Sequence, residues 1–577
     1  MKLLAGYLKP YVPRMALGFA YKFTGTIMDL LLPWILAYII DEVVPLSDMI
    51  RVLLWGAAMI LCAVFAVLGN VIANRMASAV ARDATRTIRN DLFEKIQQLS
   101  CSQFGEYTES SLISRMTSDT YNVHHMIGMM QRLGVRAPLL LIGGIIVTMT
   151  LDPVLSSILV AMLPLLGITV YFVSKKGIPL YQTHQKAADT LIRKVRESIS
   201  GIRVIKALSK SDYEKSGFEK INSDVVSKET KAGITMAVTN PVMNFLLNMG
   251  WVLIILVGAY RVNEGLTQPG RIIAFLTYFT IILNAMLSIT RLFVMFSKAG
   301  ASMERISEVL LAQEDQKTIP SEAKESEIQP SDGGWHIEFE NVTFSYNKAR
   351  NQLENISFKL KKGQTLGIIG ATGSGKSTII SLLMRMYDAD EGVIRINGRD
   401  IRSYSHEELH GMFGTVFQND TIFEDTVREN ITLGREIGQK EIEAAACHAQ
   451  IAEHIESMHG GYEAMLAIKG ANLSGGQKQR IMIARALSGN PDILVLVDSS
   501  SALDYKTDAA VRKAVRENYG NTTTIIVAQR VSSVMGADSI IVLDEGKIIG
   551  RGTHEELMRE CNEYREISRL QMNETVE

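Results

Sequence analysis

Long apolar stretches alternate with long polar stretches in the N-terminal half of the chain. A helix that crosses a bilayer needs about 20 predominantly apolar residues, and six stretches reach that length. They lie near 15–43, 52–73, 130–151, 154–173, 236–262 and 271–296. The pattern therefore predicts an α-helical membrane domain with six spanning helices.

The polar stretches between the second and third spans and between the fourth and fifth spans are long and basic. They contain runs such as RDATRTIRND and IRKVRESISGIRVIKALSKS. Lys and Arg are enriched in cytoplasmic loops, so we expect both stretches and both chain termini to be cytoplasmic. Apolar residues recur in them at helical spacing. We therefore expect long cytosolic helical extensions that form two hairpins, with tips near 102–111 and 209–217.

The pattern changes after residue 310. Residues 311–334 are charged, contain two prolines and have no apolar period, which indicates a linker. From Trp335 onward, short β-like runs alternate with helical patterns, which is typical of an α/β domain. The predicted organisation is a transmembrane domain at 1–310, a linker at 311–334 and an α/β domain at 335–577.

Composition adds little to this picture. The net charge of −1 favours neither a nucleic acid nor an acidic substrate as partner. The four cysteines show no spacing typical of a disulfide framework or a metal site. They are Cys62, Cys101, Cys447 and Cys561.

The strongest chemical signal is the segment GATGSGKST, residues 370–378. It follows the apolar run TLGII and opens a helical pattern, which is the strand–loop–helix context of a P-loop. Glycines let the backbone N–H groups wrap around phosphate, Lys376 is expected between the β- and γ-phosphates, and Ser377 offers a hydroxyl to Mg²⁺. The predicted nucleotide contacts are Gly370, Thr372, Gly373, Ser374, Gly375, Lys376, Ser377 and Thr378.

A second anion-binding pattern is LSGGQKQR, residues 473–480. A Ser-Gly-Gly turn at a helix N-terminus exposes backbone N–H donors. One chain has no second triphosphate to fill this turn, so we expect it to close over a nucleotide held by another chain. The residues involved would be Ser474, Gly475, Gly476 and Gln477. The alternative is a simple helix cap.

With both motifs, their order and the six-span pattern, nearly the whole chain resembles an ABC transporter of the exporter type. The resemblance implies an α/β P-loop nucleotide-binding domain at 335–577 that uses ATP and Mg²⁺. It implies that Tyr346 in FSYN stacks on adenine and that Gln418 in GTVFQND joins Ser377 at the metal and links it to the hairpins. It also implies that SALD, residues 501–504, crosses to the opposite site, and that the hairpin tips dock on nucleotide-binding domains, one of them on the partner's.

The chain departs from the family pattern in ILVLVDSSSALD. Counting forward from Leu473 and back from Asp504 leads to the same position, 497, for the magnesium-organising aspartate. Val497 occupies it, and Asp498 occupies the place of the catalytic glutamate. Valine has no oxygen for the metal waters, and the shorter Asp498 is held back from the attacking water. A mispositioned general base forfeits on the order of 10²–10⁴ in rate.

Two further departures agree. Gln529 stands where the family has a switch histidine at the γ-phosphate; glutamine donates hydrogen bonds but does not titrate near neutrality. Before LSGGQKQR, which corresponds to the family's signature segment, residues 467–470 read AIKG in place of the family's glycine-glutamate-arginine-glycine. We therefore expect a weak or inactive site in this chain, as in the degenerate-site half of bacterial heterodimeric multidrug-type exporters. A slow homodimer is the alternative.

The membrane half offers candidate ligand contacts. These are Met236, Asn240, Asn244 and Asn248 on one helix face, Asn284, Ser288, Arg291 and Met295 on another, and the ionisable Lys22, Asp29 and Arg136. Such groups at membrane depth usually face a bundle interior or a wet cavity. The functional interpretation is a cavity for amphipathic molecules; the alternative is hydrogen bonding between helices.

The expected function is ATP-driven export of small amphipathic or drug-like compounds across the bacterial plasma membrane, as a multi-pass half of a heterodimer. We expect a second, different half-transporter to supply the intact catalytic residues, and finding such a subunit in the neighbouring reading frame would support this. The expected partners are that subunit, membrane lipids and a small substrate, with no nucleic acid. The alternatives are a membrane regulator that binds ATP without transport, a peptide or lipid exporter, and a siderophore-type importer on the same scaffold.

Overall fold

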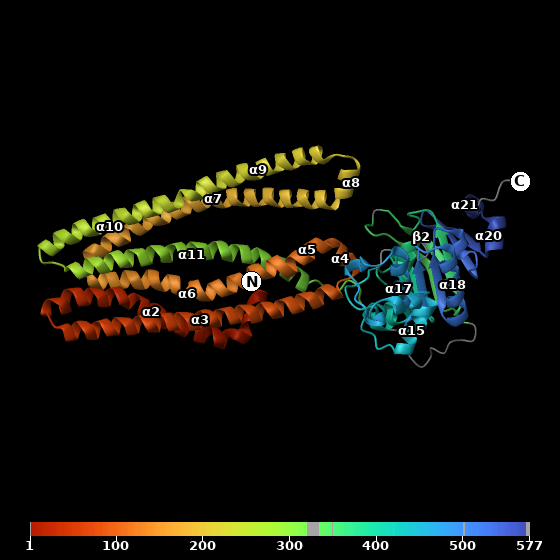
Figure 1. The fold of residues 1–577 in the computed structure, drawn as a ribbon, viewed down its shortest axis with the longest axis horizontal. Helices are drawn as coiled ribbons and strands as arrows, with labels where there is room; N and C mark the ends of the chain where they lie inside the picture. Colours follow the sequence, from red (N-terminus) through yellow and green to blue (C-terminus); the bar gives the residue numbers. More distant parts are fainter. Residues whose placement is uncertain (1, 320–333, 349, 419–420, 500–501, 573–577) are drawn as a thin grey trace. The chain divides into compact units, whose positions relative to one another are not determined.

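The computed structural model describes residues 2–319, 334–348, 350–418, 421–499 and 502–572. The chain divides into two compact units (Figure 1). The first comprises Met1–Gln98 and Thr108–Ala312, and the second comprises Leu99–Tyr107 and Gln313–Glu577.

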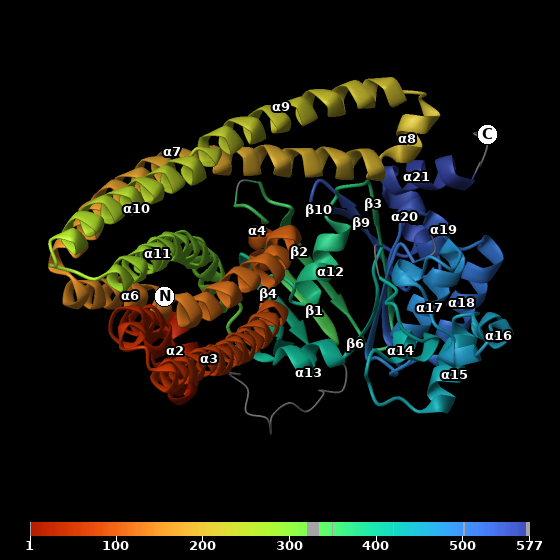
Figure 2. The same cartoon turned by 60° about the vertical axis from the view of Figure 1, so that its left-hand side comes forward.

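The first unit is built from helices. They are α1 (Lys2–Leu8), η1 (Lys9–Tyr11), α2 (Val12–Tyr38), η2 (Ile39–Val43), η3 (Val44–Leu46), α3 (Met49–Gln98), α5 (Glu109–Ser114), η4 (Arg115–Asp119), α6 (Thr120–Leu151), α7 (Pro153–Ser200), α8 (Ile202–Ala207), α9 (Ser211–Ala237), α10 (Thr239–Asn263) and α11 (Pro269–Leu310). Helices α2, α3, α6 and α11 lie side by side, and α7 runs against α9 and α10 (Figures 1 and 2).

Within the described residues, four helical stretches are long and apolar enough to cross a membrane. They are Met49–Gln98, Glu109–Leu151, Ser211–Asn263 and Pro269–Leu310. The fourth predicted span has its counterpart in the shorter apolar helix Pro153–Thr169. The first predicted span, which carries Lys22 and Asp29 within its apolar stretch, forms α2. The multi-pass character is confirmed, whereas the count of six spans stays a prediction.

The turn between α6 and α7 shows how local sequence fixes a helical hairpin. Asp152 is buried and caps α7, where its carboxylate accepts hydrogen bonds from the backbone N–H of Val154 at 2.9 Å and of Leu155 at 3.2 Å. The same carboxylate pairs with Arg261 at 3.2 Å. Pro153 begins the helix, where its missing N–H costs nothing.

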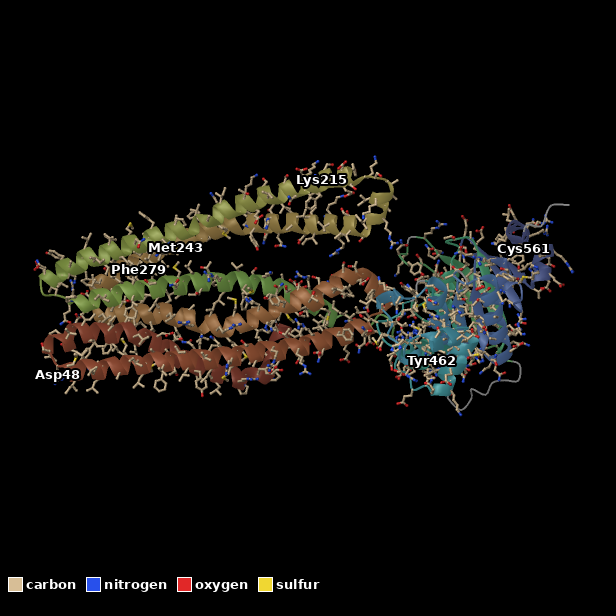
Figure 3. The ribbon with its side chains drawn as sticks, in the orientation of Figure 1. Asp48, Lys215, Met243, Phe279, Tyr462 and Cys561 are labelled. Carbon is tan, nitrogen blue, oxygen red and sulfur yellow. The ribbon has the colours of Figure 1, made fainter. Side chains whose placement is uncertain are left out.

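Side-chain packing inside the first unit joins α7, α10 and α11. Met243 of α10 and Leu166 of α7 are buried together with Leu283 of α11 (Figure 3). Phe279 of α11 (Figure 3) is buried. A methyl group added at Gly250 would lie 2.5 Å from the Phe279 ring. Glycine at this position therefore lets α10 approach α11 closely.

The second unit is the α/β domain that the sequence predicts. Its elements are α4 (Cys101–Tyr107), β1 (Ile337–Phe344), β2 (Leu353–Leu360), β3 (Thr365–Gly370), α12 (Lys376–Leu383), β4 (Glu391–Ile396), β5 (Arg399–Asp400), η5 (Ile401–Ser403), α13 (His406–Gly411), β6 (Phe413–Val416), α14 (Val427–Thr432), α15 (Gln439–His448), α16 (Ala452–Ser457), η6 (Gly461–Glu463), η7 (Ile468–Gly470), α17 (Gly475–Leu487), β7 (Ile493–Val497), α18 (Tyr505–Asn518), β8 (Thr523–Val527), α19 (Val531–Val534), β9 (Ser539–Asp544), β10 (Lys547–Gly552), α20 (His554–Glu560) and α21 (Asn562–Met572).

Two sheets organise this unit. The antiparallel sheet has the order β2-β1-β4-β5, and the second sheet has the order β10-β9-β3-β8-β7-β6, parallel except for the β10–β9 pair (Figure 2). Strand β7, ILVLV, is buried along its whole length, as expected for a parallel strand covered on both faces. The carboxyl ends of β3, β7 and β8 meet at one edge, where open α/β sheets bind ligands.

The first predicted hairpin tip, near 102–111, includes α4, which belongs to the second unit. Ser100 Oγ donates a hydrogen bond to the carboxylate of Asp315 at 2.7 Å, and Gln103 Nε2 donates to the carbonyl of Gln313 at 2.6 Å. These bonds hold α4 to the segment that follows the membrane helices. The second predicted tip, near 209–217, lies at the turn from α8 into α9, and its docking on a partner stays a prediction.

Candidate functional site

The P-loop connects the end of β3 with the start of α12. Gly373 and Gly375 adopt φ values of 86° and 102°, a region that glycine enters without steric cost. Lys376 is buried, and its Nζ donates to the carbonyls of Gly370 at 2.8 Å and Ala371 at 2.7 Å. The Lys376 ammonium therefore bonds to the backbone at the start of the P-loop, next to the predicted phosphate site.

Two observations fit this loop to a triphosphate. Ser374 Oγ is buried and has no hydrogen-bond partner among the described residues. A methyl group added at Gly373 would meet nothing within 4 Å, and Thr372 and Ser377 are exposed. The loop thus has an open side and an unsatisfied polar group, as expected of a phosphate site.

The two positive-φ glycines give a matched test of the loop. Gly375→Ala places a methyl group 2.6 Å from Leu353 Cδ2 and 3.0 Å from the carbonyl of Gln352, whereas Gly373→Ala meets open space. Both changes impose left-handed backbone strain of about 1–2 kcal/mol. We expect Gly375→Ala to lower the unfolding temperature of the nucleotide-free protein clearly more than Gly373→Ala. Thermal unfolding measures this, and equal losses would contradict the clash.

The electrostatics of the loop depend on Asp498. Burial lowers the pKa of Lys376, and the carboxylate of Asp498 opposes that shift. Asp498 therefore lies close enough to stabilise the charged ammonium. Asp498, which occupies the predicted glutamate position, therefore lies beside the P-loop.

Tyr346, the predicted adenine-stacking residue, presents 49% of its surface to solvent. Its ring packs edge-on against Phe344 at 4.9 Å and Tyr387 at 5.0 Å between centroids. Its hydroxyl donates to Thr378 Oγ1 at 3.3 Å, which ties the aromatic residue to the P-loop helix. Tyr387 was not predicted from sequence, because no motif spacing singles it out.

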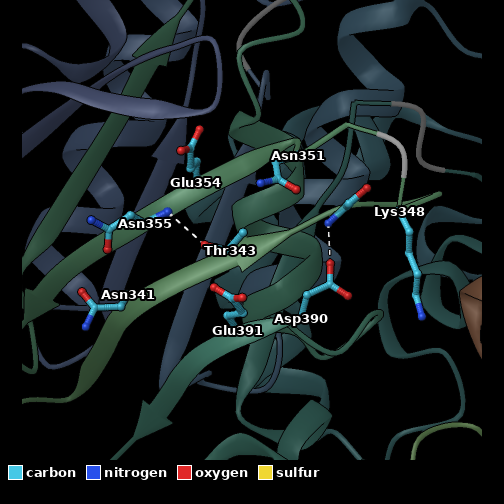
Figure 4. Close-up of a pocket in the computed structure, with 9 residues that line it drawn as sticks. Asn341, Thr343, Lys348, Asn351, Glu354, Asn355, Asp390 and Glu391 are labelled. Carbon is cyan, nitrogen blue, oxygen red and sulfur yellow. Dashed lines mark hydrogen bonds between the residues drawn. The ribbon is translucent and has the colours of Figure 1, made fainter.

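A polar depression of about 480 Å³ lies beside the segment that carries Tyr346 (Figure 4). On its wall, the backbone N–H of Ser345 donates to Asp390 Oδ2 at 2.7 Å, and that of Asn355 donates to Thr343 Oγ1 at 3.2 Å (Figure 4). The Asp390 bond fixes the backbone next to Tyr346. This hydrogen bond therefore helps to position the aromatic ring.

Val497 ends β7 inside the hydrophobic core. It is 3% exposed and is paired in register with Val527 of β8. Its side chain offers no oxygen at the sheet edge where a metal-organising carboxylate would stand. Asp498 follows at φ 47°, and its N–H donates to the carbonyl of Val527 at 2.8 Å.

Two residues that differ from the family pattern, Asp498 and Gln529, contact each other in the structure. Gln529 Nε2 donates to Asp498 Oδ2 at 3.1 Å. The side chain at the switch-histidine position thus holds the carboxylate at the glutamate position. One oxygen of the Asp498 carboxylate is therefore already engaged by a protein hydrogen bond.

Gln571, near the end of α21, braces the same loop. Its Nε2 donates to the carbonyl of Gln529 at 2.8 Å, and its Oε1 accepts from the N–H of Val531 at 2.8 Å. No sequence motif predicts this contact, because Gln571 lies in a C-terminal helix outside every motif.

The signature residues gather at the start of α17. Gln477 N–H donates to Ser474 Oγ at 3.3 Å, and Ser474 N–H donates to Gln477 Oε1 at 2.7 Å. This reciprocal cap is the simple alternative that the sequence left open. Gly475 and Gly476 follow on the first turn, and binding of another chain's nucleotide by these four residues stays a prediction.

The remaining predicted residues are placed as follows. Gln418 is exposed, directly before the undescribed positions 419–420. Ser501 lies outside the described residues, and Asp504 caps α18, where a hydrogen bond from Thr507 holds the pKa of its carboxyl below the usual value. Ile468, in the altered segment before the signature, is 63% exposed.

The described residues contain no group of three or more His, Cys, Asp or Glu side chains arranged to hold a metal ion. Mg²⁺ in nucleotide sites is commonly held by few protein oxygens together with the phosphates. Ser377 and Gln418 therefore stay the predicted protein contacts for the ion that would accompany ATP.

In the membrane half, side chains of Asn244, Asn248, Asn284, Ser288, Arg291 and Met295 are described, and that of Asn240 is not. Met295 Sδ lies 3.3 Å from His125 Nδ1. Lys22, Asp29 and Arg136, by contrast, take part in two hydrogen-bonded groups, Lys22 with Asn74, and Asp29 with Arg136 and Asn70.

Comparisons with known proteins cover the whole chain. Residues 15–286 match the ABC transporter transmembrane region, and residues 353–500 match the ABC transporter family. YfiB of Bacillus subtilis, an uncharacterized ABC transporter ATP-binding protein, is 36% identical over 98% of both chains. Rv1273c of Mycobacterium tuberculosis, named in the same way, is 32% identical over 99% of this chain and 98% of its own.

Two further similarities concern export. YgaD of Bacillus subtilis, a putative multidrug export ATP-binding/permease protein, is 31% identical over 99% of both chains. The solved structure of a bacterial Atm1-family ABC exporter with ATP bound has a TM-score of 0.81 over 100% of both chains, at 23% sequence identity. The similarity to the Atm1-family structure shows that this chain has the same fold as that exporter.

Proposed function

Since this chain belongs to the ABC transporter family, with its membrane and ATP-binding regions fused, we propose that it is one half of an ATP-driven exporter. Its partner is a second, different half-transporter. Its cargo is a small amphipathic or drug-like compound. The multidrug name of the relative YgaD and the exporter fold support this direction and cargo.

The observation that carries the proposal is the arrangement at the end of β7. Val497 is buried in the core, and Asp498 is held by Gln529 at 3.1 Å. The site therefore has neither a carboxylate to order the metal waters nor a free general base. It binds ATP and hydrolyses it slowly or not at all.

The binding parts of the site are kept. The P-loop has its two positive-φ glycines and a buried Lys376, and Tyr346 is exposed for stacking. The signature turn at Ser474 is also intact at the start of α17. Random loss of function would not be expected to alter the residues for hydrolysis alone. Here the residues that bind this chain's nucleotide and the signature turn that contacts the partner's nucleotide are both intact. This division supports a heterodimer in which hydrolysis occurs at the site that this chain completes for its partner.

In this scheme, ATP binding draws two nucleotide-binding domains together, and the hairpin tips at α4 and near the α8–α9 turn carry the motion to the helices. The protein spans the bacterial plasma membrane with both termini in the cytoplasm. Basic residues on the long hairpins and the bacterial relatives support this placement.

Transport in inside-out vesicles tests the export proposal. With both subunits present, ATP is expected to drive accumulation of a lipophilic dye, and either subunit alone is expected to give none. Because the partner site performs hydrolysis, a partner lacking its catalytic glutamate should stop accumulation. ATP binding without any transport would identify a regulator, and ATP-driven release from loaded inside-out vesicles would identify an importer.

A further inference from the structure

Six polar side chains from three helices of the first unit gather in one place, which we call the charged cluster. They are Lys22 and Asp29 of α2, Asn70 and Asn74 of α3, and Arg132 and Arg136 of α6. Helices α2, α3 and α6 pack against one another (Figure 1). The cluster therefore draws one pair of side chains from each helix of a packed trio.

Hydrogen bonds join five members of the cluster in two groups, and Arg132 Nε donates to the carbonyl of Gly128 at 3.1 Å. Arg136 Nη2 donates to Asp29 Oδ2 at 3.0 Å, and Asn70 Nδ2 donates to the same oxygen at 3.4 Å. Lys22 Nζ donates to Asn74 Oδ1 at 3.0 Å. Lys22 is 2% exposed and lies within electrostatic range of Asp29, Arg132 and Arg136.

Two helices place the cluster at the same depth. At 1.5 Å per residue, Asp29 lies roughly 27 Å along α2 from the turn at Ser47, and Arg136 lies roughly 24 Å along α6 from the turn at Asp152. Both turns face the outside in the predicted topology, and the hydrocarbon core is about 30 Å thick. The Asp29–Arg136 pair thus sits within the membrane, toward its cytoplasmic side.

The charges of the cluster do not balance. Lys22, Arg132 and Arg136 supply three cations, and Asp29 supplies one carboxylate. The next carboxylates along α3 are engaged elsewhere, since Asp83 pairs with arginines and Asp91 accepts from Tyr7. Surplus charge at membrane depth is costly unless it is paired. The cluster therefore lacks an anion.

The cluster is also partly open. The side chain of Arg136 is 40% exposed and that of Asp29 is 22% exposed. Arg136 Nε and Asn70 Oδ1 are buried without hydrogen-bond partners among the described residues. Polar groups left unpaired beside an accessible guanidinium indicate a ligand site more than a finished structural contact.

A groove continues from the cluster along α3. It measures about 450 Å³ and is lined by Val71, Asn74, Arg75, Ser78, Ala79 and Arg82. Asn74 belongs to both the groove and the cluster. Closer to the centre of the membrane, Phe65 and Leu68 of α3 have exposed fractions of 59% and 51%. An amphipathic molecule can lay its tail on these apolar side chains and its anionic group among the cations.

We propose that the charged cluster binds the carboxylate or phosphate group of an amphipathic ligand at the level of the cytoplasmic leaflet. Arg136 and Lys22 contact the anionic group, and Asp29 holds Arg136 in place and limits its affinity. Calling the ligand a transported molecule rests on the proposed export function; binding of the anion does not. The cargo class is thereby narrowed to amphipathic anions.

The test uses the full-length chain in phosphatidylcholine nanodiscs, without ATP, and two probes that differ in one charge. Dansyl-undecanoate is expected to bind at least about tenfold more tightly than its methyl ester, since one such contact is worth about 1.4 kcal/mol. Arg136→Gln removes that preference, and Arg51→Gln keeps it, because Arg51 pairs with Asp48 at the N-terminal end of α3, away from the cluster. Equal binding of acid and ester to the unaltered protein overturns the proposal.

The variant Asp29→Asn tests whether misfolding, not loss of the anion contact, explains the result for Arg136→Gln. This variant frees Arg136 from its carboxylate, so the acid is expected to bind more tightly, which damage to the fold would not produce. Weaker binding of the acid in a folded Asp29→Asn protein overturns the proposal. Phosphatidylglycerol added to the nanodiscs displaces the probe if the natural ligand is a lipid headgroup and leaves it bound if the ligand is another amphiphile. Because no step needs ATP hydrolysis, failure of export leaves this result unaffected.

Discussion

Ser474→Ala is expected to abolish ATP hydrolysis by the complex of this chain with its partner, whereas Lys376→Ala is expected to lower it only partly. Ser474 starts the signature helix α17 and is lent to the partner's competent site. Lys376 closes the P-loop of this chain's own site, where cleavage is already slow. Steady-state phosphate release from the purified complex measures both effects.

A second capping serine provides the control for this comparison. Ser405 caps α13, where its hydroxyl accepts from the N–H of Glu408 at 3.1 Å, and it has no predicted nucleotide contact. Loss of either cap costs about 1 kcal/mol of stability. Ser405→Ala should therefore keep full hydrolysis. Equal loss from Ser474→Ala and Lys376→Ala would contradict the asymmetry between the two sites.

Restoring the three altered residues together is expected to give this chain an ATPase activity of its own. The variant is Val497→Asp with Asp498→Glu and Gln529→His, and two copies supply the signature turn to each other. A positioned general base contributes on the order of 10²–10⁴ in rate, so we expect a gain of at least about 100-fold over the unaltered chain. The rate of phosphate release by the purified variant measures it.

Two variants show whether the gain is specific. Asp498→Glu alone leaves Val497 in the core and Gln529 beside the carboxylate, so little gain is expected. Val527→Asp puts a carboxylate on the strand paired with Val497, where no metal role is predicted, and it should lower stability without adding activity. A triple variant that folds and binds ATP yet stays inactive would show that the defect lies elsewhere.

Motif spacing predicted the parts of the site that are close in sequence. Gly373, Gly375 and Lys376 are near neighbours in the P-loop segment, and the spacing between Leu473 and Asp504 is enough to identify Val497. These inferences succeed because a strand, a tight loop and a helix N-terminus leave few choices of residue. The α/β domain followed from the same local patterns.

Contacts across the sheet could not be predicted in this way. Strand β8 lies between β3 and β7, and this order brings Gln529 to Asp498. Gln571 reaches the site from α21, and Tyr387 from the bend after α12, and neither belongs to a motif. In the membrane half, Lys22, Asp29 and Arg136 were recognised one by one, but their shared cluster depends on how three helices pack. Helical periodicity alone does not determine that packing.

The fate of the nucleotide at this chain's own site is the most direct test of the account. The complex is supplied with azido-ATP labelled at the γ-phosphate, allowed to turn over, and photo-crosslinked after free nucleotide is removed. This subunit is expected to retain the γ-label through many cycles of hydrolysis by its partner. Loss of the γ-label from this subunit at the rate of overall turnover would contradict it.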